Sequence, residues 1–266
     1  MMNTFRKTLL FTTSFLFFVI QMKAQDAPNS MDIAGRKQGH WIKYDENKKK
    51  VYDGNFVDNI PVGKFIYFSD TGTPWAITVF SQNGKVGFTQ DFNINGKLSG
   101  EGKYIEQKKD SLWKFYDDDG KIISEEMYLN GKKNGSCKIY YSNGKLSEEK
   151  IYVNGILDGP CIKYFNSGLI KYKGQYIKDK VEGKTTFYYP TGKICIDGNY
   201  SNDFKNGAWI FYKEDGTVLK TVHYVNSQSQ EKNDPSMMTK EEEDAAKKKY
   251  EETEVKDDKT ENYVPK

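Results

Sequence analysis

The sequence predicts an all-β protein, an elongated and twisted antiparallel sheet of about eight stacked β-hairpins with 24 residues each. The 266 residues include 19 tyrosines, 16 phenylalanines and 23 glycines but only 7 prolines. Abundant aromatic residues punctuated by glycine are typical of many short strands. The same residue types also return at a fixed interval, and apolar and polar residues alternate within each interval. The sequence therefore predicts a repeat region, residues 39–226, between two flanking segments.

The N-terminal segment has the pattern of a secretory signal peptide. Basic residues precede an apolar run of twelve residues, Leu9–Ile20. Such a run is shorter than the ~20 residues that a membrane-spanning helix needs, and it suits the core of a signal peptide. We expect residues 1–24 to be a signal peptide and residues 25–38 a linker, so the protein would be exported to the periplasm, the cell surface or the medium. An uncleaved membrane anchor is the alternative.

The repeat has a constant period of 24 residues. Its units begin at Gly39, Gly63, Gly87, Ser111, Gly135, Gly159, Gly183 and Gly207. Two places in the unit are aromatic in every copy. The sixth place holds Tyr44, Phe68, Phe92, Tyr116, Tyr140, Tyr164, Tyr188 and Tyr212. The eighteenth place holds Phe56, Phe80, Tyr104, Tyr128, Tyr152, Tyr176, Tyr200 and Tyr224.

Each unit is predicted to be one hairpin, with strands near places 2–7 and 11–18 and a turn between them. The tenth place is glycine in seven units, often after Asn or Asp, and such pairs favour the tight turns of hairpins. A second turn, for example Asn154-Gly155, leads to the next unit. The sixteenth place is also glycine in four units, where a missing side chain would let a neighbouring ring lie against the backbone. These four are Gly54, Gly102, Gly174 and Gly198.

The repeated motif resembles a known family. The pattern G-x-W-x-x-Y occurs at Gly39 and Gly207, and at Ser111 with serine in place of the glycine. Followed by N/D-G and Y-x-N-G, it is similar to MORN repeats, and most closely to the bacterial MORN-repeat variant that is often labelled antitoxin-like. The resemblance covers roughly residues 33–226. It implies an elongated sheet of stacked hairpins and a scaffolding role, near membranes in eukaryotic members. The third place departs from the aromatic pattern in four units, at Thr89, Cys137, Cys161 and Thr185.

The C-terminal segment, residues 227–266, is charged and of low complexity. Acidic residues and lysines alternate with almost nothing to bury, which favours disorder. A short helix near residues 240–253 is the partly ordered alternative, because Thr239 and Glu242 resemble a capping box. The segment is predicted to be a spacer, with a partner-binding tail as the second interpretation.

No group of residues predicts a catalytic, cofactor or metal site. His40 and His223 lie in the first and last units, and equivalent places in adjacent units are expected ~10 Å apart. This spacing keeps Cys137 and Cys161 beyond the ~7 Å Cα separation that a disulfide allows, so we expect both to be small buried residues. Cys195 and His223 belong to neighbouring units, but no third group completes a nucleophilic site.

Two local motifs imitate ligand-binding loops. Asp117-Asp118-Asp119-Gly120 lacks the ligand spacing of a calcium loop and coincides with a predicted hairpin turn. Gly183-Lys184-Thr185 lacks the first glycine of a phosphate-binding loop and begins a predicted strand. A row of lysines at the eleventh place could meet an acidic surface or phospholipid headgroups, or form a solvated edge, and we favour the edge. The row consists of Lys49, Lys97, Lys121, Lys145 and Lys193.

These observations predict an exported, non-enzymatic protein that offers an interaction or scaffold surface to a protein or cell-envelope partner. An antitoxin-like inhibitor of a toxin protein is the alternative, as the resemblance implies. A membrane surface is a further candidate partner. The net charge of +3 is nearly balanced and argues against nucleic acid, and no cofactor or small-molecule substrate is inferred.

Overall fold

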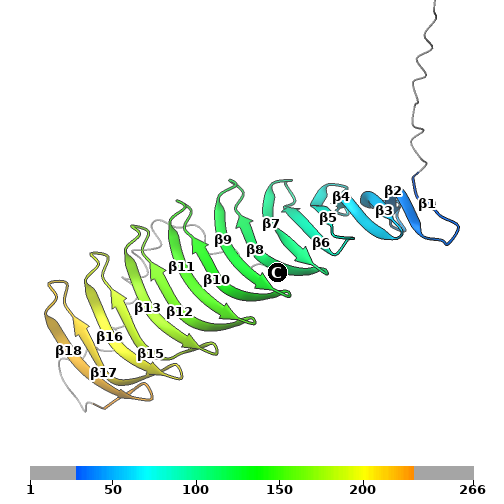
Figure 1. Cartoon of the computed structure of the whole chain (residues 1–266). Helices are drawn as coiled ribbons and strands as arrows, with labels where there is room; N and C mark the ends of the chain where they lie inside the picture. Colours follow the sequence, from blue (N-terminus) through cyan, green and yellow to red (C-terminus); the bar gives the residue numbers. More distant parts are fainter. Residues whose placement is uncertain (1–27, 231–266) are drawn as a thin grey trace, which may run out of the picture.

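Residues 28–230 are described by a computed structural model, and they form one antiparallel sheet of 19 strands without a helix. Each strand pairs with its neighbour in sequence, so the sheet grows along the chain hairpin by hairpin and twists as it does so (Figure 1). The predicted fold class is therefore confirmed. The predicted signal peptide, residues 1–24, lies outside the described residues, and so does the predicted tail from residue 231 onward. The tail was predicted to begin at residue 227, but Gln228 and Ser229 pair with Val225 and Tyr224 as a last short strand of the sheet.

The strands follow one another in chain order. They are β1 (Ser30–Met31), β2 (Lys37–Tyr44), β3 (Lys50–Val57), β4 (Ile60–Phe68), β5 (Pro74–Ser81), β6 (Val86–Phe92), β7 (Leu98–Ile105), β8 (Lys108–Tyr116), β9 (Ile122–Leu129), β10 (Lys132–Tyr140), β11 (Leu146–Val153), β12 (Ile156–Tyr164), β13 (Ile170–Ile177), β14 (Lys180–Val181), β15 (Gly183–Tyr188), β16 (Ile194–Ser201), β17 (Phe204–Tyr212), β18 (Val218–Val225) and β19 (Gln228–Ser229). β14 and β15 both pair with β13 and act as two pieces of one strand.

The two ends of the hairpins use different turns. At one end only the glycine of the tenth place has a left-handed backbone, as at Gly120, whose N–H donates to the carbonyl of Asp117 at 3.0 Å. At the other end both central residues have positive φ, for example Asn154 and Gly155 at 54° and 88°. The second pattern is the two-residue turn whose twist matches a hairpin. The sequence analysis predicted the tight turn of Asn-Gly and Asp-Gly pairs at the tenth place. The structure instead has a turn there in which one residue is left-handed.

The strands also begin earlier than predicted. β10 starts at Lys132, three residues before Gly135, and its pairing with β9 shifts register between Lys133 and Cys137. Gly135 therefore lies inside the strand as part of a bulge, with φ of +108°, rather than opening a hairpin. A bulge needs a residue that tolerates this backbone, which explains the glycine at the first place of the unit.

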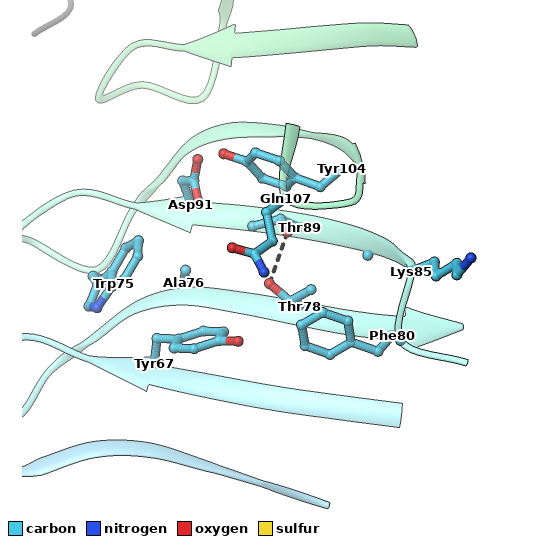
Figure 2. Close-up of a pocket in the computed structure, with 12 residues that line it drawn as sticks. Tyr67, Trp75, Ala76, Thr78, Phe80, Lys85, Thr89, Asp91, Tyr104 and Gln107 are labelled. Carbon is cyan, nitrogen blue, oxygen red and sulfur yellow. Dashed lines mark hydrogen bonds between the residues drawn. The ribbon is translucent and has the colours of Figure 1, made fainter. Parts of the chain in front are cut away.

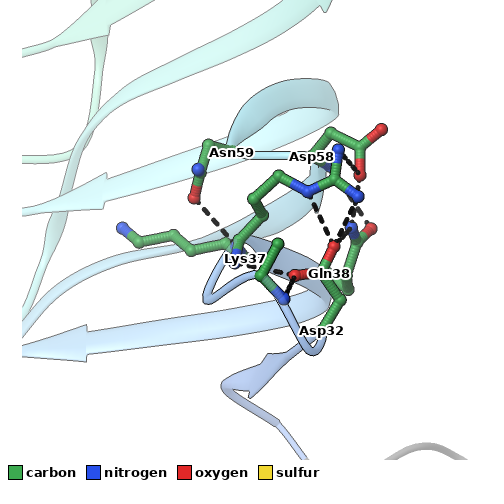
Figure 3. Close-up of polar contacts among 7 residues, drawn as sticks. Asp32, Lys37, Gln38, Asp58 and Asn59 are labelled. Atoms are coloured by element: carbon green, nitrogen blue, oxygen red, sulfur yellow. Dashed lines mark hydrogen bonds and ion pairs between the residues drawn. The ribbon is translucent and has the colours of Figure 1, made fainter.

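Part of the segment predicted as a linker, residues 25–38, is paired into the sheet. β1 lies against β2 through Ser30 and Met31. Beside it, Asp32, Gln38 and Asp58 form a polar cluster with Arg36 (Figure 3). Hydrogen bonds from Arg36, first from its backbone N–H, lower the pKa of Asp32 to about 2. The cluster joins the segment before β2 to the turn after β3 and so closes this edge of the sheet.

Candidate binding site

The residues at the third place of the eight units form a column of buried side chains along the sheet. This place is buried in all eight units, including those where it is not aromatic. Its residues are Trp41, Phe65, Thr89, Trp113, Cys137, Cys161, Thr185 and Trp209. We name the side of the sheet that carries Trp41, Trp113 and Trp209 the tryptophan face. Because successive residues of a strand point to opposite sides, the fourth place belongs to the opposite face.

Three rings of this column lie directly on a glycine of the preceding hairpin. A Cβ atom on Gly54 would lie 2.5 Å from the ring of Phe65. A Cβ atom on Gly102 or Gly198 would lie 2.3 Å from the indole of Trp113 or Trp209. The predicted packing role of these glycines is confirmed. At the fourth, Gly174, the group in the way is the hydroxyl of Tyr172 from the same strand, at 2.2 Å.

A lysine covers each tryptophan of the column. The ammonium of Lys37 lies 4.8 Å from the Trp41 ring, and that of Lys205 lies 4.9 Å from the Trp209 ring. Lys109 lies 4.3 Å from the ring of Trp113. In each case the lysine stands four residues before the tryptophan on the same strand. The tryptophan face therefore holds cations over aromatic rings as a regular part of its packing.

The two cysteine units replace the ring with an ion pair. Beside Cys137, Glu126 accepts hydrogen bonds from Lys133 at 2.9 Å and from the hydroxyl of Tyr128 at 2.6 Å. Beside Cys161, Glu148 contacts Lys150 at 2.7 Å. Charged side chains thus fill the space that an indole occupies elsewhere.

The cysteines behave as predicted. Cys137, Cys161 and Cys195 are free, and the first two are buried. Burial raises the pKa of Cys161 to about 11, with a further contribution from the carboxylate of Glu148. Burial therefore keeps the thiols of Cys137 and Cys161 protonated near neutral pH and shields them from reagents.

The unit of Thr89 differs from the others because an open depression remains. Thr89 and Thr78 share a hydrogen bond of 2.9 Å at its floor. The depression has a volume of about 210 Å³, and Tyr67, Trp75 and Tyr104 lie around it (Figure 2). Trp75 is 48% exposed and its ring centroid lies 5.8 Å from that of Tyr67.

An altered turn between β5 and β6 explains why no lysine covers this depression. At the other junctions the lysine position pairs with the aromatic residue of the eighteenth place, as Lys109 pairs with Tyr104. The β5–β6 ladder has no bulge, and there Gly87 pairs with Phe80. Lys85 is displaced into the turn, points away from the depression in Figure 2 and lies 4.0 Å from Glu106.

Asp91 is the acidic group of the depression, and Lys85 is the basic residue at its border. Asp91 occupies the fifth place, where four other units carry Tyr or Phe. Within residues 28–230 its carboxylate accepts no hydrogen bond and forms no ion pair. The nearby cation, Lys109, lies instead over the rings of Trp113 and Phe115 at 4.3 and 4.7 Å. Burial raises the pKa of Asp91 from its usual value, against the weaker effect of Lys109.

The opposite face satisfies its polar groups internally. The hydroxyl of Tyr116 donates to Glu101 at 2.6 Å, and that of Tyr140 donates to Glu125 at 2.8 Å. Burial and the hydrogen bond to Glu101 raise the pKa of Tyr116 to about 12. Tyr116 and Tyr140 thus bridge adjacent hairpins on this face.

The histidines do not combine with other groups into a site. His40 lies in β2, 2.7 Å from Asp53, and His223 lies in β18. Cys195 belongs to β16, so β17 separates it from His223. In the described part of the chain no three His, Cys, Asp or Glu side chains gather as metal ligands would.

The two loop-like motifs are ordinary elements of the sheet. The carboxylate of Asp117 accepts the backbone N–H groups of Asp119 and Lys121 at 2.9 Å each, which confirms the turn. Lys184 lies in β15, as predicted. Among the exposed lysines of the eleventh place, Lys97 donates to the carbonyl of Asp118 at 2.6 Å, so this row links neighbouring turns.

The depression was not predicted from sequence. Its signal was present, since Thr89 and Asp91 stand where the motif has aromatic residues. However, the position of Lys85 results from a longer turn between β5 and β6. This turn has two residues more than the other turns of its kind, and the ladder lacks the bulge that holds two extra residues elsewhere, so the period stays at 24 residues. Within residues 28–230 no helix is long and apolar enough to span a membrane.

Comparison with known proteins finds MORN repeats in part of the chain. The model of the MORN repeat variant matches residues 109–130, 133–154, 181–202 and 205–226, and that of the MORN repeat matches residues 52–64. Each variant match covers one hairpin and ends in the two-residue turn. MORN repeats generally mediate protein or membrane interactions, and proteins built from them are generally non-catalytic binding modules. None of the curated proteins matches this chain.

Solved structures show only weak likeness. TarM is 19% identical over 35% of this chain and 20% of its own, with a TM-score of 0.27. The Photorhabdus luminescens Tc holotoxin pore is 12% identical over 74% of this chain and 12% of its own, with a TM-score of 0.21. This chain thus spans a fifth or less of those chains, and the likenesses carry no argument about its function. The repeat matches and the stacked hairpins together show that the protein contains MORN repeats of the variant type.

Proposed function

We propose that the protein is an exported, non-enzymatic scaffold that binds a protein or cell-envelope partner through the depression on its tryptophan face. The observation that carries the proposal is the unfilled space at Thr89, where the next unit places the indole of Trp113 under Lys109. A sheet of one layer leaves this surface open to a partner (Figure 1). MORN repeats generally mediate protein or membrane interactions, which supports a binding role.

The contrast between the faces supports this choice of surface. On the opposite face, lysines and tyrosines pair with the acidic residues of the fifteenth place, such as Glu125 with Lys114 and Tyr140. The depression instead combines the exposed ring of Trp75 with the unpaired carboxylate of Asp91. Aromatic residues that are exposed beside an unpaired charge are typical of binding sites.

Export is proposed from the N-terminal pattern alone, with residues 1–24 as the signal peptide. An antitoxin-like inhibitor remains the second proposal, in which the partner would be a toxin protein that is itself exported. Both proposals place the partner outside the cytoplasm, and the identity of the captured protein separates them.

The test is affinity capture from the native host, with the full chain produced there under a C-terminal tag. Thr78→Gly combined with Thr89→Trp would rebuild the Gly102–Trp113 pair and fill the depression. Lys114→Ala serves as the matched control on the opposite face. We expect an envelope or exported protein to be enriched by the native chain and the control but lost with the filled variant. Equal capture by the filled variant, or no enrichment at all, would contradict the proposal.

A further inference from the structure

We propose that the depression at Thr89 receives a positively charged side chain, lysine or arginine, from the protein partner. Asp91 would be its counter-ion, and the rings of Tyr67, Trp75 and Tyr104 would be its walls. The inference rests on the proposed function and states what the site recognises.

The charge of the site indicates a cationic ligand. The carboxylate of Asp91 is partly desolvated, as its raised pKa shows, and it is unpaired within the described residues. A desolvated carboxylate without a partner destabilises the protein, and an approaching ammonium or guanidinium relieves that cost. An anionic or purely apolar ligand would leave the carboxylate uncompensated.

The walls of the site favour the same ligand. The negative faces of aromatic rings attract cations within about 6 Å of the ring centre. Figure 2 shows Tyr67 and Trp75 on one side of the depression, with Asp91 and Tyr104 on the other. An incoming cation would therefore meet a carboxylate and aromatic rings together.

The protein provides internal examples of this arrangement. Lys109 lies over Trp113 and Phe115, and Lys205 lies over Trp209 and Tyr224 at 4.9 Å from each ring. In the unit of Thr89 the corresponding lysine, Lys85, is held in the turn. The sheet therefore supplies rings and a carboxylate here, while the ammonium of Lys85 at the border points away from them (Figure 2).

The size of the site fits a side chain better than a larger ligand. Pockets for drug-sized molecules usually measure about 300–1,000 Å³, whereas this depression measures about 210 Å³. It is open to solvent, so a side chain projecting from a partner's surface can enter without any strand being displaced.

The test measures binding of blocked tripeptides to the purified full chain. The probes are Gly-Lys-Gly, Gly-Arg-Gly and the neutral Gly-norleucine-Gly, and binding is followed by the indole N–H resonance of Trp75 in NMR spectra. We expect saturable shifts with the lysine or arginine peptide and none with norleucine. Asp91→Asn should weaken binding about tenfold or more, because a charge-assisted contact is lost. Lys114→Ala, on the opposite face, should bind as the native chain does.

Stability provides the second measurement. Because the charge of Asp91 is unpaired, Asp91→Asn should melt at the same temperature as the native chain or higher, so weaker binding would not reflect unfolding. Equal binding of norleucine, undiminished binding by Asp91→Asn, or preferential binding of phosphatidylcholine vesicles would overturn the inference. Peptide binding without partner capture would contradict only the proposed function. If the variant with the filled depression lost the partner but Asp91→Asn still captured it, only this inference would be contradicted.

Discussion

Replacing Gly102 by alanine is expected to destabilise the sheet, because Trp113 of the next hairpin lies directly over this glycine. The new Cβ atom would lie 2.3 Å from Cδ2 and 2.4 Å from Cε2 of the indole. Carbon atoms in contact are normally about 3.5–4.0 Å apart, so the ring would have to move by about 1 Å or more. Trp113 is 0% exposed, and its Nε1 donates to the carbonyl of Lys103 at 3.0 Å. Such a displacement strains the packing and weakens this hydrogen bond.

The expected loss follows from these two effects. Overpacking a buried site costs about 1–3 kcal/mol, and a weakened hydrogen bond adds about 1 kcal/mol. We therefore expect Gly102→Ala to lower the free energy of unfolding by about 3 kcal/mol. In a protein of this size each kcal/mol changes the melting temperature by about 2–4 °C, so the midpoint should fall by roughly 6–12 °C.

Gly100→Ala is the matched control for this prediction. Gly100 lies in the same strand, β7, and neither glycine has a left-handed backbone. A Cβ atom on Gly100 would lie 3.3 Å from Cδ1 of Phe115, so a small movement accommodates it. Thermal unfolding followed by circular dichroism should place Gly100→Ala within about 1 kcal/mol of the native chain. If Gly102→Ala and Gly100→Ala had the same melting temperature, the contact between Trp113 and Gly102 would not explain the loss of stability.

Three further outcomes follow from the structure. Ser111 has φ of +61° where seven units have glycine, and relief of this strain in Ser111→Gly should stabilise the chain by about 1 kcal/mol, measured by urea unfolding. Because burial raises the pKa of Cys161 to about 11, a thiol reagent at pH 8 should label Cys195 first in the folded chain, and labelling of Cys161 should rise with pH or denaturant. Glu126→Gln leaves Lys133 without its counter-ion and should cost about 1–2 kcal/mol in thermal melts, whereas replacing both residues by methionine should be nearly neutral.

Much of the fold could be predicted because it is encoded within each unit. Turn glycines and the alternation of apolar and polar residues act over a few neighbouring residues, and the constant period of 24 multiplies their signal. The buried cysteines and the packing of Gly102 followed from the same register. The sequence did not reveal that first-place glycines such as Gly135 lie in bulges, because a bulge depends on how two strands pair.

The candidate site was harder to predict for the same reason. Thr78 lies in β5, whereas Thr89 and Asp91 lie in β6, and none of the three identifies a site by itself. Their importance depends on Lys85, which the β5–β6 turn withdraws from the tryptophan face without changing the length of the unit. A turn lengthened at the expense of a bulge leaves the period intact, so it is visible only in the pairing of the strands.

The stacked architecture explains how one unit can carry a binding site without weakening the fold elsewhere. In a repeat protein each unit contacts only its neighbours, so an altered unit changes stability locally. In two other units that lack the ring, charged residues around Glu126 and Glu148 fill the space. The unit of Thr89 has no such replacement and keeps Asp91 unpaired. A partner's cation would lie against the aromatic rings of this unit as Lys109 lies over Trp113 in the next unit. Binding would thus use the same cation–ring contact that packs the rest of the sheet.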